Sequence, residues 1–340
     1  MPIAHGTHAY AERVGVMLFA WALDDAPAQV WYVSAGPAPA ELVAALADTD
    51  TQVWAHNSAF DRTVLRHALP AMCPPLEQWR DTMVQALAHS LPASLGALCD
   101  ALGLPADKAK DKEGKQLVQL FCKPRPKGST LRRATRDTHP AQWKAFVDYA
   151  RLDVEAMREC HRRMPKWNYP NNANELALWH LDQRINDRGF AVDLDLARAA
   201  VDAVAAERER LADAANDMTL GAVQSATQRD AVLRYALAAF DVALPDLQQA
   251  TLERRIADPD LPPALRDLLA LRLEASGTAV TKYATLLRSA SPDARLRGTL
   301  QFDGASRTGR WAGRIFQPQN LPRPSLKNPE IDGGIGALKA

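Results

Sequence analysis

The chain has 340 residues, of which 47% are hydrophobic and 24% are charged. These proportions are typical of a globular protein with room for two domains, and they exclude bulk disorder and collagen-like structure. The 41 Lys and Arg residues nearly balance the 40 Asp and Glu residues, which excludes a uniformly basic surface but not a local basic patch.

Two further features concern the location of the protein. The longest apolar run, residues 14–23, is much shorter than the roughly 20 residues of a membrane-spanning helix, so we expect no membrane partner. The cysteines are widely spaced, which indicates reduced thiols in the cytoplasm rather than disulfides or a zinc site. They are Cys73, Cys99, Cys122 and Cys160.

The first half of the sequence alternates between strand and helix patterns. Strands are predicted within residues 14–23, near 29–34, at 51–55 and near 79–83. Helices are predicted over 41–47 and after residue 57, where Asn57 or Ser58 would form the cap. This alternation predicts an α/β fold in which helices pack against a sheet.

A basic segment, Lys108–Arg136, interrupts this pattern. It contains ten Lys and Arg residues against two acidic residues. One interpretation is a solvated loop. The other is a patch that faces phosphate groups, because clustered cations gain affinity for nucleic acid by releasing its counterions.

The second half of the sequence is predicted to be mainly helical. A helix is expected to begin at Pro140, residues 166–173 are expected to be a linker, and residues 174–290 carry helical apolar stripes. A capping box is predicted at Ser225–Gln228, and one long helix is predicted over 265–287.

Two short motifs in the first half could carry chemistry. The first, Asn57-Ser-Ala-Phe60-Asp61, lies at a strand-to-helix junction, and the second is Tyr149-Ala-Arg-Leu-Asp153. A spacing of four places Tyr149 and Asp153 on one face of a helix. Converging carboxylates could hold a divalent cation, and a nearby phenol could orient a water molecule.

In this order, the motifs resemble the second and third motifs of the DEDDy 3′–5′ exonucleases. That family has a ribonuclease H-like fold and hydrolyses phosphodiesters with two metal ions. The resemblance implies that Asp61 and Asp153 bind Mg²⁺, that Tyr149 is catalytic, and that Asn57 and Phe60 contact the 3′ end of single-stranded DNA. Taken singly, Tyr149 could instead be a half-buried structural residue and Asp61 a helix cap or surface acid.

The stretch from Arg307 to Arg323 resembles the opening of the palm in family A DNA polymerases, where Thr-Gly-Arg is followed by Gln-Asn-Leu-Pro. Residues 185–193 resemble that family's entry into the thumb, and residues 279–283 resemble the end of a thumb helix. The resemblance covers nearly the whole chain and is nearest to bacterial and bacteriophage polymerases of the DNA polymerase I type. It implies an N-terminally truncated exonuclease domain, a linker, a helical thumb and the start of a palm, over residues 1–165, 166–173, 174–295 and 296–340.

Primer–template DNA is the partner that this resemblance implies. Arg310 would enter the minor groove together with Gln319 and Asn320, where acceptors present in every base pair allow pair geometry to be tested without reading sequence. Arg314 belongs to the same stretch, and Lys282 would contact backbone phosphate. The alternatives are that Arg310 and Arg314 pair with nearby acids in a surface loop, and that Lys282 is an ordinary exposed lysine.

The resemblance also implies groups that we do not find. The first exonuclease motif is Asp-x-Glu on a strand, where the two acids share a face. The matches here are Asp111-Lys-Glu113 in the basic segment and Asp153-Val-Glu155 on a predicted helix, where residues two apart diverge. The polymerase aspartates and a triphosphate-binding fingers helix are also not found in these residues.

We therefore expect a fragment that is inactive alone and has an incomplete Mg²⁺ site. A second polypeptide could carry the rest of the palm and fingers, and dNTPs would be substrates of the complete polymerase. Strands that would flank the absent motif should have unpaired edges or pair directly, which should weaken the first lobe relative to the thumb. Two other functions stay open, namely a stand-alone DEDDy exonuclease and a non-catalytic protein that grips primer–template DNA.

Overall fold

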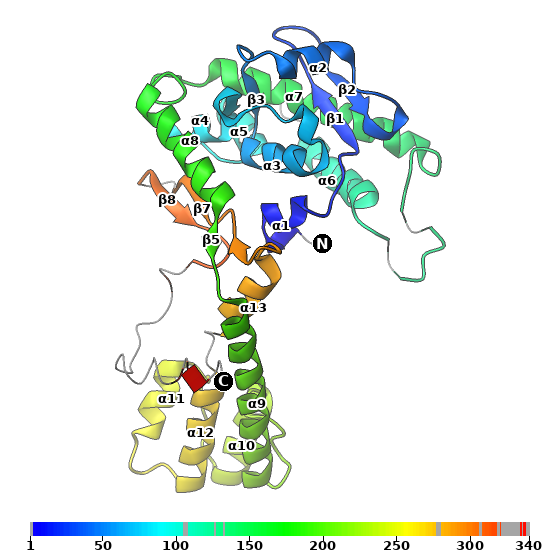
Figure 1. Ribbon diagram of the computed structural model, residues 1–340. Helices are drawn as coiled ribbons and strands as arrows, with labels where there is room; N and C mark the ends of the chain where they lie inside the picture. Colours follow the sequence, from blue (N-terminus) through cyan, green and yellow to red (C-terminus); the bar gives the residue numbers. More distant parts are fainter. Residues whose placement is uncertain are drawn as a thin grey trace. The chain divides into compact units, whose positions relative to one another are not determined.

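Helices dominate the structure, and strands occur in short pairs (Figure 1). The computed structural model describes residues 3–104, 108–125, 127–131, 133–276, 280–305, 308–317, 320, 334 and 336–337. The chain forms two compact units, one made of residues 1–190 and 295–315, the other of residues 191–294 and 316–340. The mixed α/β class predicted from the sequence is confirmed.

Two strand pairs lie in the N-terminal segment of the first unit. β1 (Leu18–Trp21) is antiparallel to β2 (Gln29–Tyr32), and β3 (Val53–Ala55) is parallel to β4 (Trp79–Asp81). The four strands fall where strands are predicted. The two pairs do not join into one sheet within the described residues, so of the two expected outcomes, unpaired edges or direct pairing, direct pairing of β1–β2 with β3–β4 does not occur there.

The helices of the first unit surround these strands, and α7 lies along β1 and β2. They are α1 (Thr7–Ala11), α2 (Ala40–Ala47), α3 (Ser58–Ala68), α4 (Thr82–Ala88), α5 (Leu95–Ala101), α6 (Lys108–Cys122), α7 (Pro140–Arg163) and α8 (Ala173–Arg188). Short 3-10 turns occupy Ile3–His5, Val33–Ala35, Pro70–Met72 and Leu76–Gln78. As predicted, Pro140 begins α7, because proline at the first helical position has no N–H that needs a partner.

Half of the predicted basic loop is a helix, α6. Leu117 and Phe121 lie four residues apart on α6 and are buried against Phe146 of α7. Burial of this apolar pair favours the helix in spite of the charges along the segment. The interpretation of residues 108–122 as an irregular loop is therefore wrong.

The predicted linker, residues 166–173, is packed into the first unit. Tyr169 is completely buried beside Trp79 and Trp179, and its hydroxyl oxygen accepts a 3.0 Å hydrogen bond from the backbone N–H of Asp81. A buried tyrosine with a satisfied hydroxyl fixes a segment rather than leaving it free. α8 also belongs to the first unit, so the division of the chain falls near Phe190 and not before Asn174.

The second unit is helical, as predicted. Its helices are α9 (Leu194–Met218), α10 (Arg229–Phe240), α11 (Gln249–Ile256), α12 (Pro263–Ala275) and α13 (Val280–Ser289). Leu265, Leu268 and Leu269 of α12 are fully buried in its core. The predicted long helix over 265–287 is instead two helices, α12 and α13.

The predicted capping box is also wrong. α10 begins at Arg229 after Gln228, whose side chain makes no capping hydrogen bond. Ser225 Oγ lies 2.9 Å from Thr227 Oγ1 instead.

The remaining strands form two small pairs. β5 (Phe190–Ala191) pairs with β6 (Arg295–Leu296), and β7 (Leu300–Ala305) is antiparallel to β8 (Arg310–Gly313) with an irregularity between Gln301 and Ala305. Gly304 lies at this irregularity, where an added Cβ would approach the Cβ of Ala312 to 2.7 Å. Among the described residues, no helix has the length and apolar character needed to cross a membrane.

Candidate functional site

The first candidate motif lies where β3 leads into α3. Asn57 precedes α3 in the left-handed conformation, with φ 65° and ψ 49°, which asparagine tolerates better than most residues. The Asn57 side chain makes no capping hydrogen bond and the residue is exposed. The predicted side-chain cap by Asn57 or Ser58 is therefore not formed. Another group accepts hydrogen bonds from the backbone N–H groups at the start of α3.

That group is Asp81, the last residue of β4. Its carboxylate accepts hydrogen bonds from the backbone N–H groups of Asn57 at 3.0 Å and Ser58 at 2.8 Å, and from the Ser58 hydroxyl at 3.0 Å. It also accepts from the N–H of Met83 at 2.8 Å, at the start of α4. One buried carboxylate thus caps two helices whose positive ends meet at it.

Burial raises the pKa of Asp81, while His56 and the N–H and O–H donors work against this rise. Asp81 was not among the predicted site residues. The signal for its local role was present, because an aspartate followed by Thr82 and a helical pattern is a common N-cap. Its contact with α3 depends on the parallel pairing of β3 and β4, which the local sequence does not encode.

Asp61 lies in the first turn of α3 and is exposed. Desolvation by the surrounding protein raises the pKa of Asp61 to about 7, and the carboxyl of Asp81 adds to the rise. An exposed carboxyl keeps part of its hydration, which limits this rise.

Phe60 stands next to Asp61 and is half-buried. Its ring stacks on Tyr10 of α1 with the ring centroids 6.0 Å apart. The contact fixes the start of α3 against α1. The predicted contact of Asn57 and Phe60 with a DNA 3′ end remains a prediction.

Tyr149 and Asp153 lie on α7, as predicted, and both are half-buried. The Tyr149 ring packs directly on the backbone of Gly114 in α6, where an added Cβ would lie 2.2 Å from Tyr149 Cε2. It also contacts the cluster around Leu117 and Phe146. Tyr149 therefore has the structural contacts that the alternative interpretation describes, and its catalytic role is untested.

The described residues do not form a two-metal site. Among them, no group of three or more His, Cys, Asp or Glu side chains could hold a metal ion. Both Asp-x-Glu matches lie on helices, Asp111 and Glu113 on α6 and Asp153 and Glu155 on α7. The Glu155 carboxylate accepts a 2.9 Å hydrogen bond from Ala28 N–H and pairs with Arg158, so it stabilises the fold.

A buried ion-pair cluster anchors α3 beside Asp61. Arg62 is buried, and its Nη1 lies 2.7 Å from Asp187 Oδ2 on α8, while Arg66 Nη1 lies 2.9 Å from the same oxygen. Burial acts to raise the pKa of Asp187, but the hydrogen bond and charge of Arg62 and the charge of Arg66 lower it below its usual value. The sequence shows no local signal for this cluster, because Asp187 is more than a hundred residues from Arg62 and Arg66.

The predicted DNA-contact residues divide into those with internal partners and those that are exposed. Lys282 Nζ donates to the carbonyls of Phe316 at 2.9 Å and Gln317 at 3.2 Å, which gives it a structural contact. Arg310 is exposed on β8, and Arg314 Nη2 bonds Gln301 Oε1. Asn320 is exposed and donates to Gln317 Oε1 at 2.7 Å. Gln319 lies outside the described residues.

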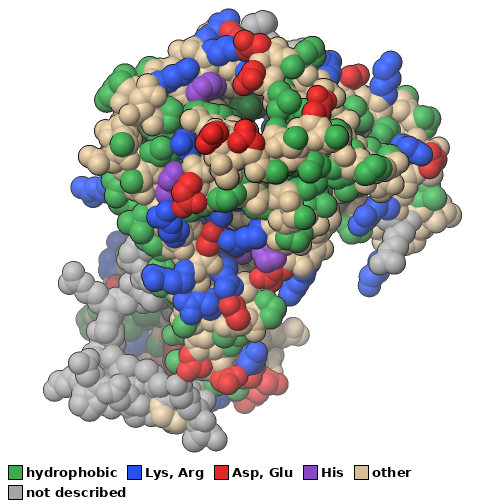
Figure 2. Space-filling view, turned by 45° about the horizontal axis from the view of Figure 1, so that its top comes forward, with side chains coloured by type: hydrophobic (Ala, Val, Ile, Leu, Met, Phe, Trp, Pro, Cys, Tyr) green, Lys and Arg blue, Asp and Glu red, His purple; other side chains and the backbone are tan. Residues whose placement is uncertain are grey.

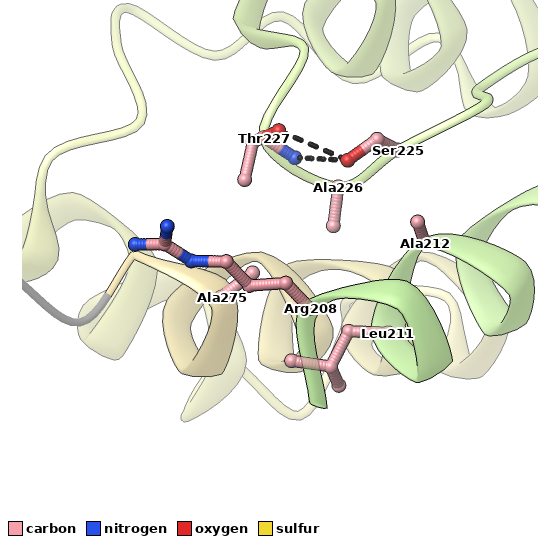
Figure 3. Close-up of a pocket in the computed structure, with 7 residues that line it drawn as sticks. All are labelled: Arg208, Leu211, Ala212, Ser225, Ala226, Thr227 and Ala275. Atoms are coloured by element: carbon pink, nitrogen blue, oxygen red, sulfur yellow. Dashed lines mark hydrogen bonds between the residues drawn. The ribbon is translucent and has the colours of Figure 1, made fainter. Parts of the chain in front are cut away.

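The second unit contains a cavity of about 340 Å³ (Figure 3). In Figure 3, Arg208 of α9 faces the turn that carries Ser225 and Thr227, and Leu211 and Ala226 supply apolar surface. A guanidinium and two hydroxyls are suitable donors for an anion. The sequence pattern at Ser225 had indicated a capping box, so this arrangement was not predicted.

Charges of both signs are interspersed over the face drawn in Figure 2. This agrees with the nearly balanced composition. Binding to an anionic partner would therefore depend on particular sites rather than on a uniformly basic face.

Comparison with known proteins gives one informative result. No protein-family profile matches the sequence. The chain is 35% identical over 340 residues to a protein named DNA polymerase from Bacillus phage SP02, and the match covers 98% of the chain. It covers 51% of that relative, so the chain spans about half of the relative's length.

Proposed function

We propose that this chain is part of a family A DNA polymerase and comprises a ribonuclease H-like 3′–5′ exonuclease domain, a thumb and the beginning of a palm. The observation that carries the proposal is the 35% identity to the phage SP02 protein named DNA polymerase, which extends over 98% of the chain. The order of the two exonuclease-like motifs and the palm-like stretch from Arg307 supports the same assignment. The substrate would be primer–template DNA, and the expected location is the cytoplasm of a bacterial cell or phage-infected host.

In this proposal the second unit and β8 contact duplex DNA. Arg310 is exposed and carries a fixed charge with several donors, and Asn320 offers an exposed amide. The cavity beside Arg208 adds a cation and two hydroxyls that suit backbone phosphate. Lys282 would act indirectly, because its ammonium group holds the backbone at residues 316 and 317.

The exonuclease part of the proposal requires more than the described residues supply. Asp61 and Asp153 would be two of the metal ligands and Tyr149 would orient the attacking water. The described residues do not fit a complete two-metal site, so we derive no catalytic step through magnesium. We expect this chain alone to have neither nucleotide addition nor efficient exonuclease activity.

The proposal is tested by equilibrium binding of the chain to a fluorescent primer–template duplex. Affinity should fall linearly with the logarithm of salt concentration, because phosphate contacts release counterions. Arg310→Gln should weaken binding about tenfold, which corresponds to one good groove contact. Arg184→Gln is the matched control, because Arg184 is exposed and pairs with Glu77 on the protein surface at 2.8 Å.

Absence of binding at low salt would contradict the proposal, as would equal losses in the two variants. Incubation with Mg²⁺ and dNTPs should leave the primer unextended. Extension would overturn the expectation of inactivity while leaving the polymerase assignment in place. Binding without turnover is the result that also fits the alternative function, a non-catalytic protein that grips primer–template DNA.

A further inference from the structure

A second cavity, of about 250 Å³, lies in the first unit away from the side chains assigned above. Two of its walls come from neighbouring strands, because Trp54 of β3 is paired in register with Arg80 of β4. Side chains alternate along a strand, so these two project from the face opposite Val53, Ala55 and Trp79, which belong to the core. The other polar lining residues are Gln52, His161, Lys166 and Asn171.

Two cations line this cavity, and its lining contains no carboxylate. Arg80 Nη1 donates to the backbone carbonyls of Glu77 at 2.7 Å and Trp79 at 2.8 Å, which fixes the guanidinium while leaving its charge uncompensated. Burial lowers the pKa of Arg80, Tyr169 partly opposes this, and no carboxylate is among the causes of the shift. In the part of the chain that the structure describes, neither Arg80 nor Lys166 has an ion-pair partner.

The remaining walls are held in place by hydrogen bonds. The backbone N–H of Asn171 donates to Lys166 O at 3.0 Å, which closes the turn that brings both side chains to the cavity. Gln85 Nε2 donates to Pro165 O at 3.0 Å, so its Oε1 is the atom that accepts from His161 Nδ1 at 2.7 Å. His161 Nε2 is therefore an acceptor in the neutral ring. Burial, together with the charge of Lys166, lowers the pKa of His161 to about 4.

An aromatic ring completes the cavity. The rings of Trp54 and His161 lie with centroids 4.0 Å apart, and Trp54 Nε1 donates to Gln52 Oε1 at 3.3 Å. A fixed indole beside two unpaired cations and two amides matches the parts of a nucleotide, because phosphate seeks cations, a base stacks on an aromatic face, and amides can bond its edge. The lack of carboxylates argues against a metal ion as the occupant.

We propose that this cavity is a binding site for the phosphate group of a nucleotide, with Arg80 and Lys166 as its cations and Trp54 as a stacking surface for the base. The phosphate could belong to a free mononucleotide or to a unit within a DNA strand. The inference rests on the cavity and its charges alone. It stands or fails independently of the polymerase assignment.

Isothermal titration calorimetry of the full chain with dTMP, inorganic phosphate and thymidine tests the proposal. We expect dTMP and phosphate to bind and thymidine to give no detectable heat. Lys166→Gln should weaken dTMP binding about fivefold or more, because one of two charge-assisted contacts is lost. Trp54→Leu should weaken binding of dTMP but not of inorganic phosphate.

The matched control is Lys144→Gln, which removes the same charge from an exposed position on α7 outside the cavity. It should bind dTMP like the unmodified chain. An oligothymidylate that lacks terminal phosphates is then tested as a competitor of dTMP. If it displaces dTMP, the phosphate belongs to a DNA strand; if it does not, the ligand is a free nucleotide. Failure of dTMP to bind at millimolar concentration, or identical affinities of the Lys166 and Lys144 variants, would overturn the proposal.

Discussion

Arg62 and Arg66 lie one turn apart on α3, and both meet the carboxylate of Asp187 on α8. Arg62 also donates to Gln183 Oε1 at 3.2 Å and to both oxygens of Asp187, while its Nε is buried with no hydrogen-bond partner among the described residues. A buried cation of this kind depends on its partner, because water cannot replace the lost carboxylate. The start of α3, with Asn57 and Asp61, is positioned by this cluster as well as by Asp81.

We predict that Asp187→Asn lowers the free energy of unfolding of the first unit by about 3–5 kcal/mol, because it leaves the buried Arg62 without a charge partner. The control is Glu77→Gln in the same unit, whose partner Arg184 is exposed, and it should cost less than about 1 kcal/mol. Urea denaturation followed by circular dichroism measures both. Similar losses for the two variants would show that the Asp187 cluster contributes no more than a surface pair.

His8 makes the stability of the same region depend on pH. Burial lowers the pKa of His8 to about 4; Asp187 partly opposes this, and Arg66, Arg62 and Arg297 add to it. The unfolded chain keeps a pKa of 6.5, so between these values it binds more protons than the folded chain. The contribution of neutral His8 to the free energy of unfolding is fully present above about pH 6.5 and is lost as the pH falls towards 4.

We therefore predict that replacing His8 with Gln flattens the acid side of the stability profile. Across this window the difference should reach about 3 kcal/mol, which is the pKa shift converted to free energy. Unfolding free energies at several pH values between 8 and 4, for the unmodified chain and the His8→Gln variant, provide the measurement. Parallel profiles over this range would contradict the assignment.

At the scale of elements, Gly114 determines how closely α6 approaches α7. Because it lacks a side chain, the Tyr149 ring can lie against the α6 backbone, in contact with the cluster of Leu117 and Phe146. Glycine usually weakens a helix, so its presence in the middle of α6 has a packing reason. The position of the candidate catalytic phenol depends on this contact.

We predict that Gly114→Ala destabilises the first unit by about 1–3 kcal/mol, because the added methyl group would overlap the Tyr149 ring. Gly96→Ala on α5 is the matched control, since nothing lies within 4 Å of its added Cβ. That variant should be neutral or more stable by up to about 1 kcal/mol, as expected for alanine in a helix. Thermal unfolding of both variants tests this difference, and equal destabilisation would remove the proposed role of Gly114.

The sequence predicts elements better than the contacts between them. The strand at 53–55, the helix beginning at Pro140 and the helical second half follow from local periodicity and proline chemistry, and all are present. The α6 helix is not predicted, because the many charges of the segment indicate a loop and the sequence does not show that Leu117 and Phe121 are buried together. The capping of two helices by Asp81 and the packing of Tyr149 on Gly114 could not be predicted, because each depends on residues that only the folded chain brings together.

At the scale of the whole molecule, the two units are built in different ways. The first unit contains separate two-stranded pairs within its described residues, β1–β2 and β3–β4 among them, and an isolated two-stranded pair is only marginally stable. The second unit is built on one core of fully buried leucines on α12, with Leu211 of α9 packed among them. This difference predicts unequal resistance to local opening.

We predict that backbone amides of β1 and β2 exchange with solvent at least about tenfold faster than those of α9 and α12, after correction for intrinsic rates. Hydrogen exchange measured by mass spectrometry on peptides covering residues 17–33, 208–216 and 263–275 would show it. The amides of α4, which Asp81 caps, serve as an internal reference for the first unit. Slow exchange in α4 together with fast exchange in β1 and β2 would show that the strands are weak, whereas fast exchange in all three would show that the whole unit is unfolded. Equal protection of β1 and α12 would mean that β1 is as firmly held as the leucine core, and that the separation of the two strand pairs has no energetic consequence.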